Sequence, residues 1–162
     1  MAIYSVIGVG EHGKFFDENS YQDAITYISQ NGTAPYMGGE NLTSMETAAA
    51  EMKATAVSFG KDSGKRLRHS VLSFDESEHV TPEQAHTYGQ QIIQHYAPEY
   101  QIAYAVHANT ENPHIHFVMN QISCKDGHRY RGQKQDYYDF KRHIQSVIHR
   151  PVLLVKNTHP EK

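Results

Sequence analysis

Residues 100–122 read YQIAYAVHANTENPHIHFVMNQI and place His107, His114 and His116 in two apolar runs. Successive side chains of a strand point to opposite faces, so His114 and His116 share one face while Ile115 and Phe117 take the other. The polar segment between the runs, with its Asn and Pro residues, predicts the loop of a β-hairpin. If His107 pairs with His114 across that hairpin, the two Cβ atoms lie about 5 Å apart, close enough to share an ion.

These three histidines predict a metal site. Neutral imidazole is the commonest metal ligand, and three of them leave coordination positions open for substrate or water, as a catalytic site requires. By ligand preference the ion is zinc, manganese or nickel. The alternative is a histidine pair that only packs or hydrogen-bonds in the hairpin, but the third histidine favours metal binding.

The composition describes one soluble domain. The chain has 162 residues, 38% hydrophobic and 20% charged, which is enough for a real core and argues against disorder. Cys124 is the only cysteine, so an intrachain disulfide is excluded and a reducing compartment is expected. The start of the chain lacks the pattern of a signal peptide and no segment has the length of a membrane span, so we expect a cytoplasmic protein.

The net charge is −3, but basic residues are concentrated in two stretches. Residues 53–68 hold five basic residues and one acidic residue, and residues 125–150 hold seven and three. Local patches set the field that a phosphate backbone meets, and Tyr130, Tyr137 and Tyr138 add rings for base stacking. A solvated charged face is the alternative. The candidate DNA-binding residues are Arg66, Arg68, Arg129, Arg131, Lys134, Lys141 and Arg142.

Strand-like and helix-like segments are mixed along the chain. Alternation and apolar runs predict strands at 2–9, 66–74, 100–107 and 114–122, with a short apolar run at 152–155. Capping and turn residues predict helices at 20–30, 44–57, 81–96 and 136–149, and a loop at 33–41. The order predicts one α+β domain in which helices flank an antiparallel sheet. In the strand at 66–74, His69 and Ser73 share one face.

Three segments resemble the motifs of conjugative relaxases, the plasmid-mobilisation nucleases of the HUH endonuclease class. Val106–Asn120 resembles the third motif, including its loop, Arg68–Phe74 resembles the second, and Asp23–Ile28 resembles the first. Their order and spacing fit as well, over roughly residues 20–150. The resemblance implies a relaxase-like two-layer or three-layer sandwich. We expect residues 1–162 to form a single relaxase domain, either a minimal relaxase or the N-terminal part of a longer protein.

The resemblance implies metal-dependent nicking and rejoining of one DNA strand at a transfer origin. Tyr27 would attack the scissile phosphate and leave a 5′-phosphotyrosine and a free 3′-hydroxyl. His107, His114 and His116 would hold the ion, expected to be magnesium or manganese, with zinc or nickel as substitutes in vitro. The base for Tyr27 is a ligand histidine, His69 or a metal-bound hydroxide.

Supporting roles fall to residues near these motifs. His69 and Ser73 would contact phosphate or support the site, or simply hydrogen-bond within the sheet. Asn120 shares the histidine face and is a candidate to orient a ligand. Tyr27 flanks the apolar stripe of its helix and could instead pack its ring, in which case Tyr21 or Tyr36 would replace it.

The implied partners are single-stranded transfer-origin DNA, an adjacent DNA hairpin, accessory relaxosome proteins and the coupling protein of a type IV secretion system in a bacterial cytoplasm. We expect a monomer. Three other functions stay open: a rolling-circle initiator or transposase of the HUH class, a noncatalytic metal- or DNA-binding module, and a metallohydrolase that uses water. Motif order disfavours the first, because those enzymes place the tyrosine after the histidines.

Overall fold

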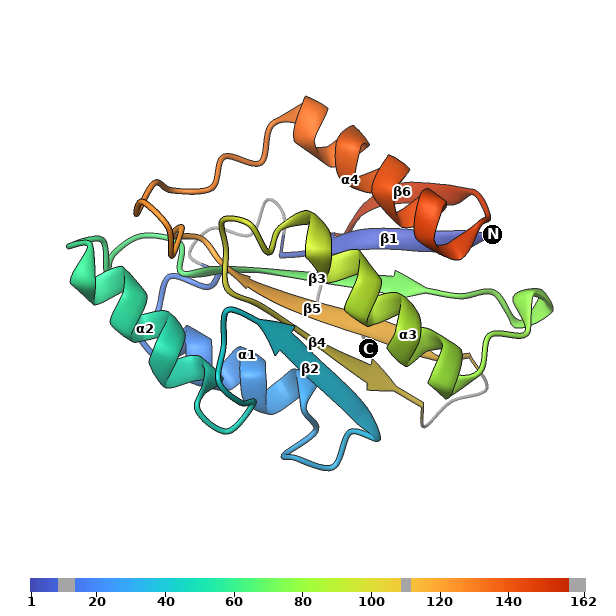
Figure 1. Ribbon diagram of the computed structural model, residues 1–162, viewed down its shortest axis with the longest axis horizontal. Helices are drawn as coiled ribbons and strands as arrows, with labels where there is room; N and C mark the ends of the chain where they lie inside the picture. Colours follow the sequence, from blue (N-terminus) through green and yellow to red (C-terminus); the bar gives the residue numbers. More distant parts are fainter. Residues whose placement is uncertain (9–13, 109–111, 158–162) are drawn as a thin grey trace.

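The computed structural model describes residues 1–8, 14–108 and 112–157. In this part of the chain the strands form a single sheet in the order β2-β4-β5-β3-β1-β6 (Figure 1). The strands are β1 (Ala2–Ile7), β2 (Tyr36–Glu40), β3 (Leu67–Ser73), β4 (Ile102–His107), β5 (His114–Asn120) and β6 (Val152–Asn157). The predicted antiparallel pairing is confirmed for all neighbours except β6, which runs parallel to β1 at the edge.

Helices cover both faces of the sheet, so the fold is a three-layer sandwich. The helices are α1 (Ser20–Ile28), α2 (Ala48–Ser58), α3 (Pro82–Ile92) and α4 (Lys134–Ile148), with short 3₁₀ turns at Glu76–Glu78 and Ile93–His95. Figure 1 shows α1 beside α2, and α3 and α4 together in front of the sheet. No helix in the described ranges is long and apolar enough to cross a membrane.

Alternation along the strands creates two separate cores. Ile115, Phe117 and Met119 of β5 pack with α3 and α4, whereas Val118 packs with α1 and α2. The predicted alternation of β3 is confirmed, because Leu67 lies in the α1–α2 core and Leu72 lies in the α3–α4 core. Even and odd positions of β3, β4 and β5 therefore point to opposite faces of the sheet, one covered by α1 and α2 and the other by α3 and α4.

The predicted loop at 33–41 is wrong, because residues 36–40 form strand β2. Glycine allows this strand to approach its neighbour: a Cβ at Gly38 would lie 3.0 Å from the Tyr104 ring, and one at Gly39 would lie 2.9 Å from the Ile102 carbonyl. Glycine usually weakens a strand, so its presence favoured a loop in the sequence, while the close approach is visible only in the sheet.

Helix α1 begins at Ser20 as predicted, but two other predicted helix starts are wrong. Helix α2 begins at Ala48 instead of Ser44, and α4 begins at Lys134 instead of Asp136. Residues 43–47 instead form a turn in which the Glu51 carboxylate accepts hydrogen bonds from the Thr43 backbone and the Thr47 hydroxyl. The capping box at Thr81 and Gln84 is confirmed, with reciprocal bonds of 2.9 and 3.1 Å.

Candidate active site

The hairpin of β4 and β5 brings the histidines of the third motif together. His107 pairs with His114 across the two strands, which is the register that a shared site for the two histidines requires. On the other side of β5, Ser73 of β3 pairs with His114, and Val71 pairs with His116. His69, His107, His114 and His116 therefore all lie on the face of the sheet that α1 and α2 cover.

Tyr27 lies over this group of histidines. Its ring centroid is 5.7 Å from that of His69, 5.9 Å from that of His107 and 5.7 Å from that of His116, with edge-on geometry in each case. The tyrosine is 47% exposed although all three of these histidines are buried. The last turn of α1 thus holds a solvent-accessible phenol against a cluster of rings.

The end of α1 is fixed by His107. Nε2 of His107 lies 2.9 Å from the carbonyl oxygen of Ile28, the last residue of the helix. The carbonyl groups in the last turn of a helix have no partner within the helix, so this bond satisfies one of them. Because the next residue along the chain from Tyr27 is tied to His107, the phenol and the histidines share one rigid support.

His69 and His116 form a buried pair between the second and third motifs. Nε2 of His69 lies 3.0 Å from Nδ1 of His116, and the two residues are 5% and 1% exposed. The ring of His116 also stacks on that of His107, with centroids 3.9 Å apart. Sequence reasoning placed His69 beside the site, and this contact is what brings it there.

Burial keeps these rings neutral. Loss of solvent, followed by the neighbouring histidines, lowers the pKa of His116 to about 2. Loss of solvent, followed by the charge of His107, lowers the pKa of His69 to about 3. Burial also lowers the pKa of His107, against the opposing effect of the Ile28 carbonyl. A neutral imidazole carries the lone pair that a metal ion or a phenolic proton requires.

The histidine side chains of the site are chemically suitable ligands for a divalent metal ion. A carbonyl can only accept, so Nε2 of neutral His107 carries the hydrogen and Nδ1 carries the lone pair. Ring N–H groups of metal-binding histidines commonly donate to a backbone carbonyl in this way. Among residues 1–8, 14–108 and 112–157, however, no group of three His, Cys, Asp or Glu side chains is arranged to hold an ion. Coordination by all three predicted ligands requires imidazole rings to turn.

Ser73 and Asn120 differ in their relation to this site. Ser73 is the direct neighbour of His114 across β3 and β5. Asn120 is fully buried, and its amide nitrogen donates to the Met52 carbonyl and the Gln101 side chain, while its oxygen accepts from the Ile122 amide. These bonds tie α2 to the end of the hairpin, and none of them reaches a histidine.

The Ile28 carbonyl is the functional group that sequence reasoning missed. A backbone carbonyl carries no sequence signal, and its relation to His107 depends on how α1 packs on the sheet. The substitute tyrosines lie elsewhere: Tyr21 is buried in the α1–α2 core, and the Tyr36 hydroxyl donates to Glu83. Neither has a ring contact with the histidines of the site among the described contacts.

Two of the seven predicted DNA-binding residues, Arg66 and Arg129, donate hydrogen bonds to backbone carbonyls. Nη1 of Arg66 donates to the carbonyls of Phe16 and Gly64, and the guanidinium of Arg129 donates to the carbonyls of Lys65 and Ser63. These bonds clamp the turn before β3, so both cations are largely committed to backbone groups. Arg142 pairs with Asp139 on the surface of α4.

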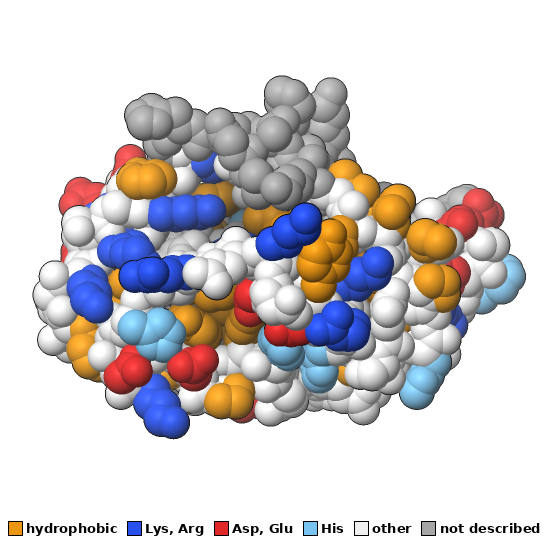
Figure 2. Space-filling model, turned by 90° about the horizontal axis from the view of Figure 1, so that it is seen from above, with side chains coloured by type: hydrophobic (Ala, Val, Ile, Leu, Met, Phe, Trp, Pro, Cys, Tyr) orange, Lys and Arg blue, Asp and Glu red, His pale blue; other side chains and the backbone are white. Residues whose placement is uncertain are grey.

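The remaining cations lie near the start of α4 or along it. Arg131 and Lys134 are exposed, Lys141 is half-buried, and Arg68 is buried on the α3–α4 side of the sheet. Figure 2 shows Lys and Arg side chains spread over the middle of the face seen from above. Arg68 and His69 are neighbours in the sequence, so their side chains lie on opposite faces of the sheet.

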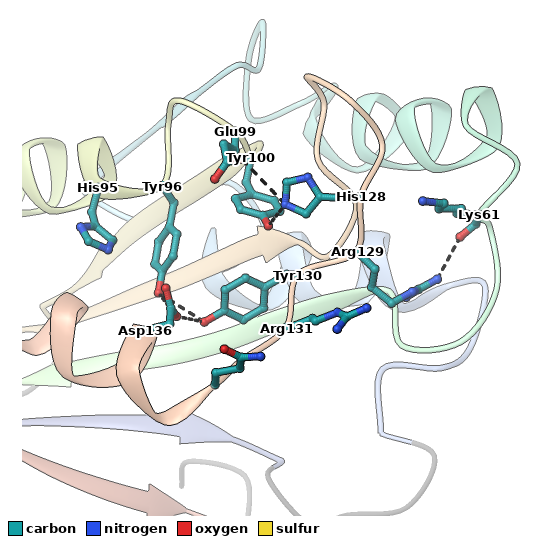
Figure 3. A pocket seen from close by; sticks show the side chains of 11 residues that line it. Lys61, His95, Tyr96, Glu99, Tyr100, His128, Arg129, Tyr130, Arg131 and Asp136 are labelled. Atoms are coloured by element: carbon teal, nitrogen blue, oxygen red, sulfur yellow. Dashed lines mark hydrogen bonds and ion pairs between the residues drawn. The ribbon is translucent and has the colours of Figure 1, made fainter.

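A pocket of about 580 Å³ lies beside the segment that leads into α4 (Figure 3). Within it the Tyr96 and Tyr130 hydroxyls both donate to Asp136, and the Tyr100 hydroxyl lies 2.6 Å from Nε2 of His128. Its polar groups largely satisfy one another, which is the pattern of a structural network.

Comparison with known proteins agrees with this geometry. Residues 27–150, more than half of the chain, match the family described as "Relaxase: MobA/VirD2-like, nuclease domain". A Staphylococcus aureus protein named "Protein rlx" is 28% identical over 157 residues, which is 92% of this chain and 49% of the relative. A second S. aureus protein of that name is 31% identical over 98 residues, 60% of this chain and 29% of the relative.

A more distant relative is the "Group II intron-interrupted relaxase LtrB" of Lactococcus lactis subsp. cremoris, 24% identical over 113 residues, 69% of this chain and 20% of the relative. The chain thus spans half or less of the length of the curated relatives it matches. The family match, residues 27–150, contains Tyr27 and all the histidines of the site. The chain belongs to the relaxase family and carries its MobA/VirD2-like nuclease domain.

Proposed function

We propose that this domain nicks and rejoins one DNA strand at a transfer origin, with Tyr27 as nucleophile. The observation that supports the proposal most directly is the position of Tyr27, an exposed phenol within 6 Å, ring to ring, of three neutral histidines. Nicking of this kind would start the conjugative transfer or mobilisation of a plasmid or integrative element.

In the proposed reaction, the Tyr27 oxygen attacks the scissile phosphorus in line. A bond forms between the phenolic oxygen and phosphorus, and the bond from phosphorus to the 3′-oxygen breaks. The phenolic proton passes to a neutral histidine beside the ring, and the leaving 3′-oxygen gains a proton to become a hydroxyl. The phosphodiester energy is kept in the 5′-phosphotyrosine, so the reverse attack rejoins the strand without a nucleotide cofactor.

The fixed end of α1 supports this role. A phenol with an ordinary pKa near 10 is a weak nucleophile unless a base lies close by. Because His107 holds the Ile28 carbonyl, the phenol keeps its distance from the histidines, and alignment of this kind supplies a large part of catalysis in phosphoryl transfer.

His107, His114 and His116 would hold a divalent cation, magnesium or manganese, with His69 orienting His116. A cation there would draw charge from a non-bridging phosphate oxygen and fix the position of the phosphate. Ser73, the cross-strand neighbour of His114, would contact phosphate or support that histidine. The proposal extends to a single domain that acts as a monomer in the bacterial cytoplasm, with the transfer-origin hairpin, relaxosome proteins and a coupling protein as partners.

The test uses single-stranded oligonucleotides that tile the plasmid or element that encodes the protein, incubated with manganese. We expect an adduct that survives denaturation and maps by mass spectrometry to Tyr27. The adduct should disappear with chelator and in Tyr27→Phe, and should persist in Tyr88→Phe, a matched change on the opposite face of the sheet.

Other outcomes would replace the proposal. Cleavage without an adduct would indicate a hydrolase that uses water. DNA binding without cleavage would indicate a noncatalytic module, and an adduct at another tyrosine would remove Tyr27 from the mechanism.

A further inference from the structure

A second pocket, of about 510 Å³, lies on the face of the sheet opposite to the histidines. Val6 and Leu154 provide apolar walls, Arg68 lies on β3, and Lys134, Tyr137 and Tyr138 come from the first turns of α4. The volume falls within the range of small-molecule sites. Nothing in the proposed nicking reaction uses this pocket.

The charge of Arg68 has no counter-ion in the part of the chain that the structure describes. The side chain is only 9% exposed, yet the ion pairs among the described residues leave it without a carboxylate. Its guanidinium carbon lies instead 5.2 Å from the ring of Tyr130 and 5.4 Å from the ring of Tyr137. A buried cation without an anion is costly, so an anionic ligand would be favoured here.

Two buried polar atoms at the pocket also have no hydrogen-bond partner among the described residues. They are Nε of Arg68 and the hydroxyl oxygen of Tyr137. Such groups are rare in native proteins and call for an explanation such as a ligand. The polar groups of the pocket in Figure 3 differ, because Tyr96, Tyr130 and Asp136 bond to one another.

The pocket offers an aromatic surface as well as positive charge. Tyr138 is 42% exposed, and Nζ of Lys134 lies 5.9 Å from the centre of its ring. The N-cap of α4, Gln133, makes no side-chain capping bond, so backbone N–H groups of the first turn are left for an acceptor. Phosphate needs the cations and N–H groups, while a base needs the exposed ring.

We propose that this pocket binds one nucleotide of single-stranded DNA, with its phosphate at Arg68 and Lys134 and its base against Tyr138. The proposal rests on the proposed function, which supplies DNA as the substrate. It gives the domain a contact for the strand on the side of the sheet away from Tyr27.

The first measurement is the affinity of the protein for oligodeoxythymidylate of about 20 nucleotides over a range of salt concentrations. For Lys134→Ala combined with Tyr138→Ala, we expect the dissociation constant to rise about ten-fold. For Lys134→Ala alone, the slope of log affinity against log salt should fall by about one unit. The matched control is Lys53→Ala, which removes an exposed lysine on α2 and should change neither the affinity nor the salt slope. Both altered side chains of the pocket are exposed, so the fold should be retained.

The second measurement is photo-crosslinking of the same oligonucleotide carrying 5-iododeoxyuridine, with the site mapped by mass spectrometry. A cross-link to Tyr138 supports the proposal. Affinity and salt slope in Lys134→Ala equal to those of Lys53→Ala, or cross-links only to tyrosines outside the pocket, overturn it. Competition of the Tyr138 cross-link by free deoxythymidine monophosphate, with no change of oligonucleotide affinity in the variants, would assign the pocket to free nucleotides and overturn the DNA contact.

The two proposals fail separately in these experiments. A Tyr138 cross-link without any adduct at Tyr27 would support the nucleotide pocket and overturn nicking. A Tyr27 adduct without a Tyr138 cross-link would support nicking and overturn the pocket.

Discussion

Nε2 of His69 lies 3.0 Å from Nδ1 of His116, and this contact joins β3 to the histidine pair of β5. The bond fixes the orientation of the His116 ring beside Tyr27. Each ring is buried, so neither can exchange this partner for water without moving.

His69→Gln should weaken metal binding and slow nicking by about 10- to 100-fold, the usual effect of changing a residue that orients a metal ligand. Manganese titration by calorimetry and single-turnover cleavage would measure the two effects. The control is His86→Gln, because His86 contacts Tyr104 on the opposite face of the sheet. Nicking within two-fold of wild type would show that His69 does not position His116.

The domain should lose stability as the pH falls below about 6.5. The pKa values of His69 and His116 are lowered by burial to about 3 and about 2, so in this range the unfolded chain binds protons that the native protein does not. Stability therefore falls as pH falls, by roughly 1 kcal/mol per pH unit for each ring. Urea unfolding between pH 6.5 and 5, with chelator present, would measure the slope.

The matched variants for that experiment are His69→Gln and His79→Asn. His69→Gln should remove the contribution of one buried ring from the slope of stability against pH. His79→Asn should leave that slope unchanged, because His79 is exposed and has a φ of 51°, which Asn tolerates. An identical slope in all three proteins would contradict the assignment to the buried pair.

Asn120→Leu should destabilise the fold without a specific effect on metal affinity. The change leaves the Met52 carbonyl, the Gln101 side chain and the Ile122 amide without their partner, at a cost of about 2–4 kcal/mol in all. Urea unfolding would measure this loss, with Gln90→Ala on the exposed side of α3 as control. A lowered manganese affinity at full folding would restore Asn120 as a residue that orients a ligand.

Gly89→Ala should destabilise the domain although alanine is the better helix former. Helix propensity favours the change by up to about 1 kcal/mol. The new Cβ would lie 2.7 Å from the Tyr104 ring, and overpacking of this kind costs about 1–3 kcal/mol. Thermal unfolding should therefore show a lower midpoint, and a rise would mean that the Tyr104 ring moves freely. Gly60→Ala, with nothing within 4 Å, isolates the backbone effect of a positive φ.

The local pattern of this chain determined most of its elements and one pairing. Period-two alternation identified β3, β4 and β5, and the capping box identified the start of α3, because both signals depend on side chains close in sequence. The sequence also predicted that β4 and β5 pair as a hairpin, but it left the His107–His114 register as a condition, and the sheet supplies that register. The glycine-containing strand β2 and the parallel pairing of β6 with β1 depend on partners distant in sequence, so local pattern could not predict them.

At the site, sequence alone determined that His114 and His116 share a face, since alternation is a property of any strand. Only the tertiary structure decided that Tyr27 lies on that face, because the packing of α1 on the sheet and the bond from His107 to Ile28 set its position. It also decided that Arg66 and Arg129 bind carbonyls, while Arg68 has no acidic partner among the described residues. The sequence shows the charge of a basic residue but not the group that the charge contacts, because that group is brought near by packing between segments distant in sequence.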